Sequence, residues 1–318
     1  MTTRRSSTPT VRRTLTLTEF ERARGQLGRA IARRRSAWGS HGWAVVGPPR
    51  SLRIEIAVPR TLLRPDSPIG AVPLPRAIGG SIKLSARSSF RRATPPSEPS
   101  ALVAATTSAI AEAYAPGSRI LVNSNPVEEA GVACFVIADD VVHMLTCGHP
   151  FQPRAVGTAV FAANTKVATL SHNFLDDDEQ LDIACCQVTP AGLQLAAASA
   201  NAPSWCTEIL PAIQGQHQPA VFWPTNAAAS DAVTTTINSY SASESGLSNR
   251  FWDLELDQLI RTEGITLPGD SGSLLMVRDR YYAACTGKPD SWSYYTPLHH
   301  AMERLRNLFT QVDLWLPG

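Results

Sequence analysis

The spacing of apolar and polar residues in the first part of the chain is typical of a small mixed domain. Apolar side chains recur at helical spacing over 19–35, which predicts an amphipathic helix with an arginine-rich polar face. An alternating run at 52–58 and shorter apolar runs at 42–47 and 82–84 predict three strands. We therefore expect a small α+β domain over residues 18–92.

From residue 118 onward, the pattern changes to short apolar runs that are bounded by turn residues. The predicted strands cover 120–122, 133–137, 141–146, 158–162, 167–170, 183–188, 220–223, 251–259, 273–277 and 281–285. Many short strands in succession favour a β-sandwich or a β-barrel. Apolar residues at helical spacing near the end predict a C-terminal helix, with Thr296 as its N-cap and Pro297 as its first residue.

The segment between these two regions has the composition of a linker. Residues 93–100 combine prolines with serine and threonine, which favours an extended chain without a core. The alanine-rich residues 101–114 predict a helix that Pro116 and Gly117 would end. Residues 1–17 contain little to bury and are predicted to be a disordered basic tail. The predicted parts are therefore 1–17, the domain 18–92, a linker and helix over 93–117, and a domain over 118–318.

Charge divides the chain into two parts of opposite sign. Residues 1–92 hold 19 Lys and Arg against 4 Asp and Glu, a net charge of +15, whereas residues 93–318 hold 10 against 23, a net charge of −13. Three explanations of the basic part remain open: binding of nucleic acid through phosphate contacts, docking on the acidic part of the same chain, or a solvated face without a partner. The aromatic residues of the basic part are too scattered to form a base-stacking surface, which counts against the first explanation.

The bulk composition is that of a globular protein. With 318 residues, of which 43% are hydrophobic and 18% charged, the chain has room for about two domains. No run of about 18 apolar residues occurs, so we expect no membrane span. The N-terminus lacks the apolar segment of a secretory signal, and six cysteines without such a signal favour a reducing compartment. We therefore expect a cytoplasmic protein.

One short stretch near the C-terminus, Gly269–Ser273, has the composition of a turn that presents a nucleophile. Ser271 lies between two glycines and follows Asp270. Glycines permit positive φ and the close approach of a substrate, and the amides of such a turn can stabilise an oxyanion. By itself the sequence Gly-Asp-Ser-Gly also suits any surface turn, so its meaning depends on the rest of the chain.

A histidine and an aspartate elsewhere complete the set of residues that acyl transfer requires. His149 follows the predicted strand 141–146, and Asp182 directly precedes an apolar run that begins at Ile183. A carboxylate in this position is well placed to be half buried and hydrogen-bonded. A serine hydroxyl needs a neighbouring base, and the base needs a carboxylate that fixes its tautomer.

Together, the three motifs resemble those of the trypsin-like (chymotrypsin-fold) serine proteases. Thr146–His149 is similar to the family's Thr-Ala-Ala-His motif, Asp182–Ala184 to its Asp-Ile-Ala motif, and Gly269–Ser273 to its Gly-Asp-Ser-Gly-Gly motif. The resemblance covers residues 118–310 and is closest to bacterial, intracellular-looking members that carry a small α+β domain upstream. It implies a mainly β fold, a chymotrypsin-like double β-barrel with a C-terminal helix.

The resemblance also implies roles for single residues. His149 would be the general base, Asp182 the residue that orients it, and Ser271 the nucleophile. The amides of Gly269 and Ser271 would form the oxyanion hole. By the family's offset from the nucleophile, Ile265 would form the floor of the primary specificity pocket, which predicts cleavage of a peptide or protein after small or apolar side chains. The wall of that pocket would consist of Cys285, Thr286 and Gly287.

The chain also departs from the family's pattern. It contains no Ile-Val-Gly-Gly segment that could form a new N-terminus after cleavage and pair with Asp270, so Asp270 needs another partner. Ser273 replaces the last glycine of the family's motif, which by itself does not prevent the chemistry. Cys147 lies two residues before His149 rather than just after it, so the family's usual disulfide is in doubt here.

No cofactor and no metal are predicted. The spacing of Cys147, His149, Cys185 and Cys186 matches no standard zinc pattern, and buried strand positions explain these cysteines better. The acidic run 176–179 fits a solvated loop better than a calcium site. His143 is expected to be structural, and His299 and His300 on the last helix are expected to lie on the surface.

The sequence therefore predicts a serine endopeptidase that hydrolyses peptide bonds through an acyl-enzyme and carries a basic N-terminal domain. The alternative is a protease-fold scaffold or binding module without turnover, whose basic N-terminal domain binds nucleic acid or a protein partner. The three intact motifs favour the enzyme.

Overall fold

The structure is a computed structural model of the 318-residue chain. It describes the backbone of residues 42–46, 53–58 and 82–86 and, in the second part of the chain, residues 114–122, 127–152, 155–176, 181–225, 232–248, 253–267, 269–287 and 292–318. The chain divides into two compact units, Met1–Ala86 and Arg87–Gly318. Four predicted segments lie outside the described residues: the tail 1–17, the helix 19–35, the linker 93–100 and, apart from Tyr114, the helix 101–114.

In the first unit the structure describes three strands, β1 (Gly42–Val46), β2 (Arg53–Val58) and β3 (Ile82–Ala86). β1 pairs with β2 in antiparallel orientation, and β2 pairs with β3 in parallel. The three strands that the apolar pattern predicted for this unit are confirmed.

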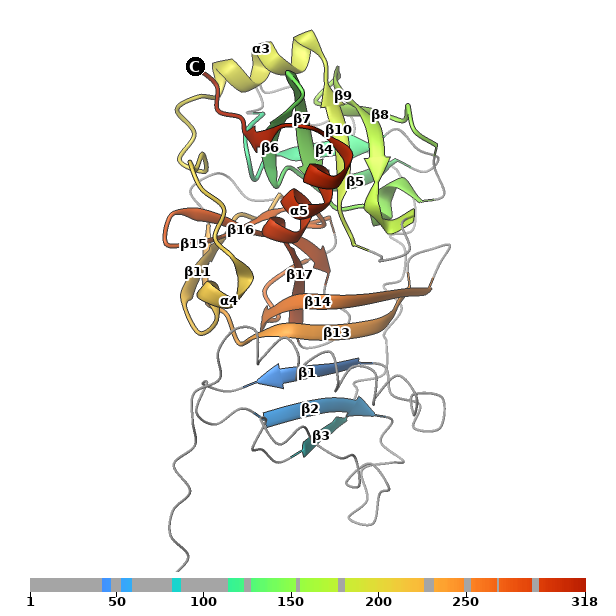
Figure 1. The fold of residues 1–318 in the computed structure, drawn as a ribbon, viewed down its shortest axis with the longest axis vertical. Helices are drawn as coiled ribbons and strands as arrows, with labels where there is room; N and C mark the ends of the chain where they lie inside the picture. The colour runs from blue at the N-terminus through green and yellow to red at the C-terminus, as the bar shows by residue number, and fades with distance from the viewer. Residues whose placement is uncertain are drawn as a thin grey trace, which may run out of the picture. The chain divides into compact units, whose positions relative to one another are not determined.

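The first sheet of the second unit has eight strands in the order β18-β6-β7-β10-β9-β8-β4-β5, and all neighbours are antiparallel (Figure 1). Its strands are β4 (Arg119–Val122), β5 (Glu128–Gly131), β6 (Cys134–Ala138), β7 (Val141–Thr146), β8 (Ala159–Ala162), β9 (Thr165–Asn173), β10 (Ala184–Val188) and β18 (Val312–Leu314). Asp139 and Asp140 both have positive φ and join β6 to β7, as a tight two-residue hairpin requires.

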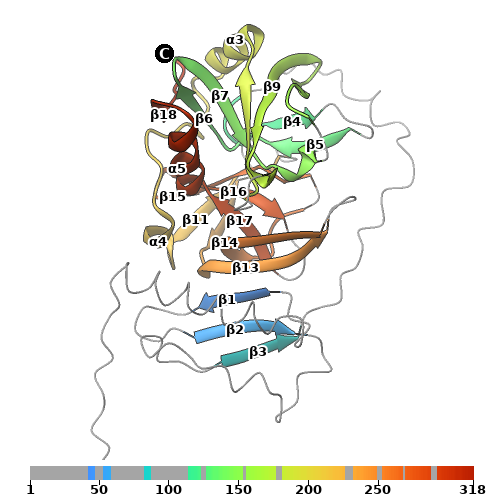
Figure 2. The same cartoon turned by 45° about the vertical axis from the view of Figure 1, so that its right-hand side comes forward.

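The second sheet of this unit is formed by the later part of the chain, in the order β12-β11-β15-β16-β17-β14-β13, again with antiparallel neighbours. Its strands are β11 (Pro219–Phe222), β12 (Val233–Thr236), β13 (Ser239–Ser248), β14 (Asp253–Glu263), β15 (Leu274–Val277), β16 (Arg280–Gly287) and β17 (Trp292–Pro297). Figure 2 shows this sheet curled beside the first one. β15 begins three residues after Ser271, so the sheet fixes the end of the loop that carries this serine.

A shared apolar core joins the two sheets. It contains Leu145 and Ile183 from the first sheet and its loops, and Leu274 and Tyr281 from the second. Helix α5 (Leu298–Leu308) adds Leu305 to the same core. Burial of these side chains holds the two sheets in a fixed relation, which any site built between them requires.

The C-terminal helix begins one residue later than predicted. Pro297 is its N-cap and Leu298 its first residue, so the prediction of Thr296 as the cap is wrong. The Thr296 side chain instead lies 2.8 Å from the Thr286 hydroxyl, in a hydrogen bond between β17 and β16. Tertiary contact therefore outweighs local capping at this position.

Two α-helices and five strands of the second unit were not predicted. Helix α3 (Pro190–Ala198) has Thr189 as its N-cap, whose hydroxyl accepts a hydrogen bond from the Gly192 amide at 3.1 Å. The other unpredicted elements are the short α4 (Ala212–Gly215) and the strands β5, β12, β13, β17 and β18. Of these strands, β5, β12 and β18 are only three or four residues long and β13 is rich in serine, so their apolar pattern is weak. β17 mixes aromatic residues with serine, threonine and proline.

The fold class predicted from the sequence is confirmed: the described chain is mainly β, with two curled antiparallel sheets and a helix near the C-terminus. No helix within the described ranges is long and apolar enough to cross a membrane.

Candidate active site

His149 lies at the end of a buried strand of the first sheet. β7 ends at Thr146, and after two residues the 3-10 helix η3 (His149–Phe151) begins at the histidine itself. The Thr146 hydroxyl donates a 2.6 Å hydrogen bond to the Gly131 carbonyl of β5. Asn173, at the end of β9, donates through its Nδ2 to the Gly148 carbonyl at 3.2 Å. Both contacts hold the short segment that carries His149.

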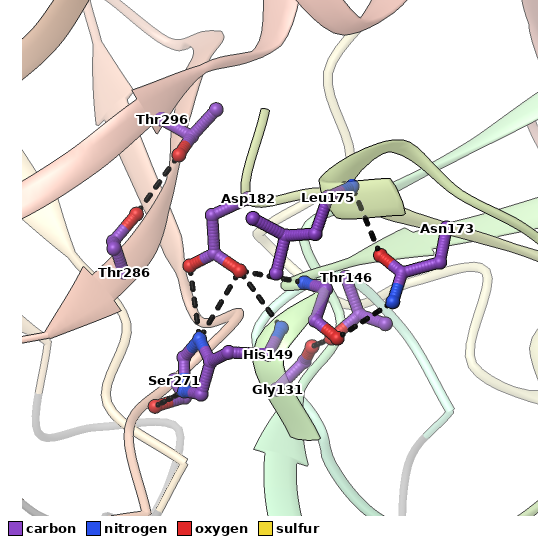
Figure 3. Close-up of polar contacts among 10 residues, drawn as sticks. Gly131, Thr146, His149, Asn173, Leu175, Asp182, Ser271, Thr286 and Thr296 are labelled. Atoms are coloured by element: carbon purple, nitrogen blue, oxygen red, sulfur yellow. Dashed lines mark hydrogen bonds and ion pairs between the residues drawn. The ribbon is translucent and has the colours of Figure 1, made fainter. Parts of the chain in front are cut away.

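Asp182 is fully buried and receives hydrogen bonds from the histidine segment. Its Oδ1 accepts from the amides of Gly148 at 2.9 Å and His149 at 2.8 Å. Its carboxylate also contacts the His149 ring, with 2.9 Å between Oδ2 and Nδ1 (Figure 3). Because a carboxylate only accepts, His149 carries its proton on Nδ1 in this arrangement, and Nε2 is the nitrogen that can accept a hydrogen bond.

Ser271 contacts the other side of the same imidazole. Its Oγ lies 2.9 Å from His149 Nε2 (Figure 3). The two sheets therefore bring together three residues that are 33 and 89 positions apart in sequence: His149, Asp182 and Ser271. Hydrogen bonds of these lengths, from serine to histidine to aspartate, form the geometry that activates a hydroxyl for nucleophilic attack.

Glycines at positive φ shape the turn that presents Ser271. The Asp270 amide donates to the Leu267 carbonyl at 3.1 Å, and Gly269 at the third position of this turn has φ +95°. Gly272 has φ +83°, and a Cβ added there would lie 2.6 Å from the Gly131 carbonyl oxygen. A side chain at Gly272 would therefore collide with the first sheet, which explains the glycine on both steric and conformational grounds.

Backbone hydrogen bonds tie this turn to both sheets. The Gly131 amide of β5 donates to the Ser271 carbonyl at 2.6 Å, and the Gly272 amide donates to the Cys285 carbonyl of β16 at 2.6 Å. Within the described part of the chain, no group accepts a hydrogen bond from the amides of Gly269 or Ser271. The predicted oxyanion-hole donors are thus available to a ligand.

The surroundings of His149 raise its pKa. Burial by itself would lower the pKa, since it disfavours the imidazolium. The charge of Asp182 and its hydrogen bond, together with the charge of Glu128, outweigh that effect and raise the pKa of His149 above its ordinary value. The His149 side chain is 18% exposed, so it remains accessible to a ligand.

One residue predicted for the specificity pocket, Ile265, contacts a pair of hydroxyl groups. The amides of Ile265 and Thr266 both donate to Ser293 Oγ at 3.0 Å, and the Thr266 hydroxyl lies 2.9 Å from the same oxygen. Ile265 and Gly287 are half-buried. The side chains of Cys285 and Thr286 are buried, so this part of the wall can offer a ligand little besides its backbone. Sequence reasoning missed Ser293, which lies 22 residues after Ser271.

The structure shows the hydrogen-bond partners of Asp270, which the sequence alone did not identify. Its Oδ1 accepts hydrogen bonds from the Thr225 amide at 3.0 Å and the Thr225 hydroxyl at 3.1 Å. Its Oδ2 accepts from the Leu267 amide at 2.8 Å. No local signal marks Thr225, which lies 45 residues before Asp270 in an unpredicted loop after β11.

The six cysteines of the chain are free thiols in the structure, and all are buried. Burial, with a smaller effect from the neighbouring Asp182 charge, raises the pKa of Cys147 well above its ordinary value. Burial and the charges of Asp270 and Asp182 do the same for Cys285. A raised pKa keeps these two thiols protonated near neutral pH, and a protonated thiol is a poor nucleophile. Within the described ranges, no cluster of histidine, cysteine and acidic side chains could hold a metal ion.

Two of the remaining histidines differ from the sequence prediction of surface positions. His299 is half-buried, and its Nδ1 accepts a hydrogen bond from the Ala212 amide at 3.3 Å. Burial and the adjacent His300 lower the pKa of His299 to about 3. His300 contacts the Tyr240 hydroxyl and Glu303, each at 3.2 Å, so both histidines anchor the last helix. His143 is buried, as a structural role requires.

Solved structures similar to this chain include serine proteases. A Nocardiopsis protease matches with a TM-score of 0.46 and 13% identity, over 63% of this chain and 98% of its own. A Cellulomonas bogoriensis chymotrypsin matches with a TM-score of 0.45 and 15% identity, over 64% and 98%. The active form of a protease from M. tuberculosis matches with a TM-score of 0.40 and 18% identity, over 61% and 81%. With TM-scores below 0.5, these similarities do not establish the chemistry of this chain.

Comparison of the sequence with models of protein families and with curated proteins finds no match.

Proposed function

We propose that this protein is a serine endopeptidase of the trypsin-like type, with Ser271 as nucleophile, His149 as general base and Asp182 as the residue that orients the base. The 2.9 Å contact between Ser271 Oγ and His149 Nε2, with the buried Asp182 behind the ring, is the observation that carries this proposal. A serine, a histidine and a carboxylate in this order form the arrangement that acyl transfer needs.

The reaction follows from the protonation state of this arrangement. The Ser271 oxygen forms a bond to the scissile carbonyl carbon while its proton passes to His149 Nε2, and the carbonyl electron pair moves onto oxygen. The amides of Gly269 and Ser271 stabilise that oxyanion. When the tetrahedral intermediate collapses, the C–N bond breaks, the amine leaves with the proton from His149, and the acyl group stays on Ser271.

Water then reverses these steps. A water molecule gives a proton to His149 as its oxygen attacks the acyl carbon, and the ester bond to Ser271 breaks as the serine oxygen recovers the proton. Throughout, Asp182 stabilises the imidazolium that forms at His149. Asp182 can do so because the amides of Gly148 and His149 hold its carboxylate in place.

We also propose that the enzyme cleaves after small or apolar side chains. Two amides occupy the lone pairs of Ser293 Oγ, so its hydroxyl can only donate, and the Thr266 oxygen at 2.9 Å is the acceptor. The Ser293 hydroxyl is therefore satisfied within the protein. None of the proposed pocket residues is charged, so a lysine or arginine side chain would find no counter-ion there. Exposed Leu267 adds an apolar surface beside them.

A labelling experiment tests the proposed function. A fluorophosphonate probe should label the full-length chain on Ser271, and Ser271→Ala should remain unlabelled while keeping its thermal stability. Ser273→Ala, a buried serine two residues away, is the matched control and should be labelled. A folded wild-type chain that no probe labels would instead support the alternative, a protease-fold scaffold or binding module without turnover.

The charge division supports a second proposal, that the basic N-terminal part docks on the acidic part of the chain. Screening by salt would weaken such docking, so activity and its salt dependence should differ between the full chain and a chain that lacks residues 1–92. Binding of nucleic acid is the alternative, and retention of the full chain on a nucleic acid at physiological salt would favour it. The six free thiols are compatible with the proposed cytoplasmic location.

A further inference from the structure

Asp270 is a buried carboxylate next to the nucleophile. It is 1% exposed, and no cation forms an ion pair with it among the described residues. A buried carboxylate without a counter-ion is stable only if hydrogen-bond donors replace the lost water. The structure provides three donors: the amide and hydroxyl of Thr225 and the amide of Leu267.

The Thr225 hydroxyl contacts two successive parts of the turn. Its oxygen lies 3.1 Å from Asp270 Oδ1 and 2.9 Å from the Gly269 carbonyl oxygen, so its single hydrogen lies between two acceptors. The Gly269 carbonyl belongs to the same turn as the amides of Gly269 and Ser271, which would form the oxyanion hole. A contact to this carbonyl therefore sets the orientation of the turn as well as satisfying the carboxylate.

The position of Thr225 is fixed by the same sheet that continues from Ser271. β15 begins three residues after Ser271, and β11 pairs with it through Val221 and Phe222. The Trp223 amide extends this pairing by donating to the Leu274 carbonyl at 2.9 Å. Two residues later, the chain reaches Thr225 and contacts Asp270. The turn is thus held between β11 and β15, two adjacent strands of one sheet. None of these contacts requires a new N-terminal amine, which only cleavage of the chain would create.

We infer that Thr225 is a positioning residue that holds the nucleophile turn, residues 267–272, in its assembled form in the uncleaved chain. This inference rests on the proposed function, because the turn matters for catalysis only if Ser271 is the nucleophile. Thr225 touches no reacting atom, and it acts through Asp270 and Gly269. The neutral hydroxyl of Thr225 donates to the Asp270 carboxylate, where a charged partner would otherwise be needed.

The test uses the full-length, uncleaved chain and the fluorophosphonate probe. Mass spectrometry of the labelled protein should show the probe on an intact chain. Thr225→Val keeps the shape of the side chain and the amide but removes the hydroxyl, so its labelling rate should fall about 10- to 100-fold, as expected for loss of a hydrogen bond to a charged group. Thr225→Ser restores the hydroxyl and should recover the rate.

Two controls separate positioning from a general loss of structure. Thr235→Val removes a hydroxyl from another buried threonine, on β12 of the same sheet, and should keep the wild-type rate. The far-downfield NMR signal of the proton that His149 and Asp182 share should be unchanged in Thr225→Val, because that pair belongs to the first sheet. If Thr225→Val does not fold, Thr225→Cys takes its place, and its weaker donor should give a reduced rate.

The outcomes distinguish this inference from the proposed function. A wild-type chain that is labelled neither intact nor after cleavage would refute the proposed function and the inference with it. A labelled wild type, with folded Thr225→Val or Thr225→Cys labelled equally fast, would overturn the inference alone. Labelling that occurs only after the chain has been cleaved would also overturn it.

Discussion

The two sheets of the second unit contribute to the candidate site in different ways. The first sheet supplies His149 and Asp182, which lie next to buried strands and are joined by side-chain and amide hydrogen bonds. The second sheet supplies Ser271 from a turn whose shape depends on two glycines at positive φ and on a buried carboxylate. The half that holds His149 and Asp182 is thus fixed by its own strands, whereas the half that holds Ser271 is fixed by a turn and its distant contacts.

This difference predicts different responses to mutation. In the first half, the Asp182 carboxylate both binds the amides of Gly148 and His149 and carries the charge beside the His149 ring. Its loss should therefore affect activity most. In the second half, the Ser271 carbonyl and the Gly272 amide bond to different sheets, so a change in the turn should affect stability and chemistry together. The following substitutions separate the two halves.

The largest effect is expected for Asp182→Asn. An amide in place of the carboxylate would favour the wrong histidine tautomer, so kcat/KM for a peptide ester substrate should fall about 10⁴-fold, as in serine hydrolases of this arrangement. Steady-state kinetics and the fluorophosphonate labelling rate would measure the loss. Asp176→Asn, in the adjacent segment η4 (Phe174–Asp176), is the control and should keep most of the activity. Unchanged activity in folded Asp182→Asn would contradict the assignment of the base.

The next effect is expected for Gly272→Ala. The added methyl group would meet Thr146 and the Gly131 carbonyl of the first sheet, in a conformation that disfavours side chains. We expect a loss of about 2–4 kcal/mol in the free energy of unfolding, together with a fall in the labelling rate. Chemical denaturation measures the first quantity and probe kinetics the second.

Gly157→Ala is the matched control for that substitution. Gly157 has a similar φ of +99°, but nothing lies within 4 Å of an added Cβ. Its cost should be that of backbone strain alone, about 1 kcal/mol, with the labelling rate unchanged. If Gly272→Ala and Gly157→Ala destabilise the protein equally, the glycine at 272 is needed for its backbone conformation and not for contact with the first sheet.

A third prediction concerns pH. Because the pKa of His149 is raised and the base must be neutral, kcat/KM should fall as the pH drops through a value above 6.5, the ordinary pKa of histidine. The same shift means that protonated His149 stabilises the folded state. That contribution is full below the unfolded pKa and is lost as the pH rises through the folded pKa. A pH–rate profile with its acid limb below 6.5 would contradict the electrostatic account of Asp182.

The smallest effect is expected for Glu128→Gln. Glu128 contributes to the raised pKa of His149 through charge alone, so its neutral variant should shift the acid limb slightly downward. The shift should shrink at high salt, since screening weakens an interaction between separated charges. Glu129→Gln, whose carboxylate pairs with Arg119 instead, should leave the limb in place. Equal shifts in both variants would point to net charge rather than to Glu128.

Sequence patterns predicted those elements whose stability is local or strongly apolar. The buried strands β6, β7 and β10 were recognised from their apolar runs, and the turn at Gly269 from its glycines. In contrast, β13 is rich in serine and forms a strand because β14 pairs with it over most of its length. Helix α3 was missed although Thr189 and Pro190 carry a usable capping signal.

The residues of the candidate site also fall into two groups: those that a short motif marks and those whose role appears only after folding. His149, Asp182 and Ser271 were proposed from sequence because each lies in a short recognisable motif. Ser293, Asn173 and Thr225 were not proposed, because a hydroxyl or amide acquires its meaning only from the group that folding places beside it. The predicted helix cap at Thr296 failed for the same reason, since its hydroxyl bonds across the sheet to Thr286.

By itself, the sequence determined which residue types are available for acyl transfer, the mainly β character of the second part of the chain, and the opposite charges of its two parts. These properties depend on composition and on spacing over a few residues. Only the tertiary structure decided that His149 reaches Ser271, that Ser293 binds the amides of Ile265 and Thr266, and that Asp270 is satisfied by Thr225. Each of these contacts joins residues 27 to 122 positions apart. Their proximity results from burial of the core that the two sheets share, which no local pattern encodes.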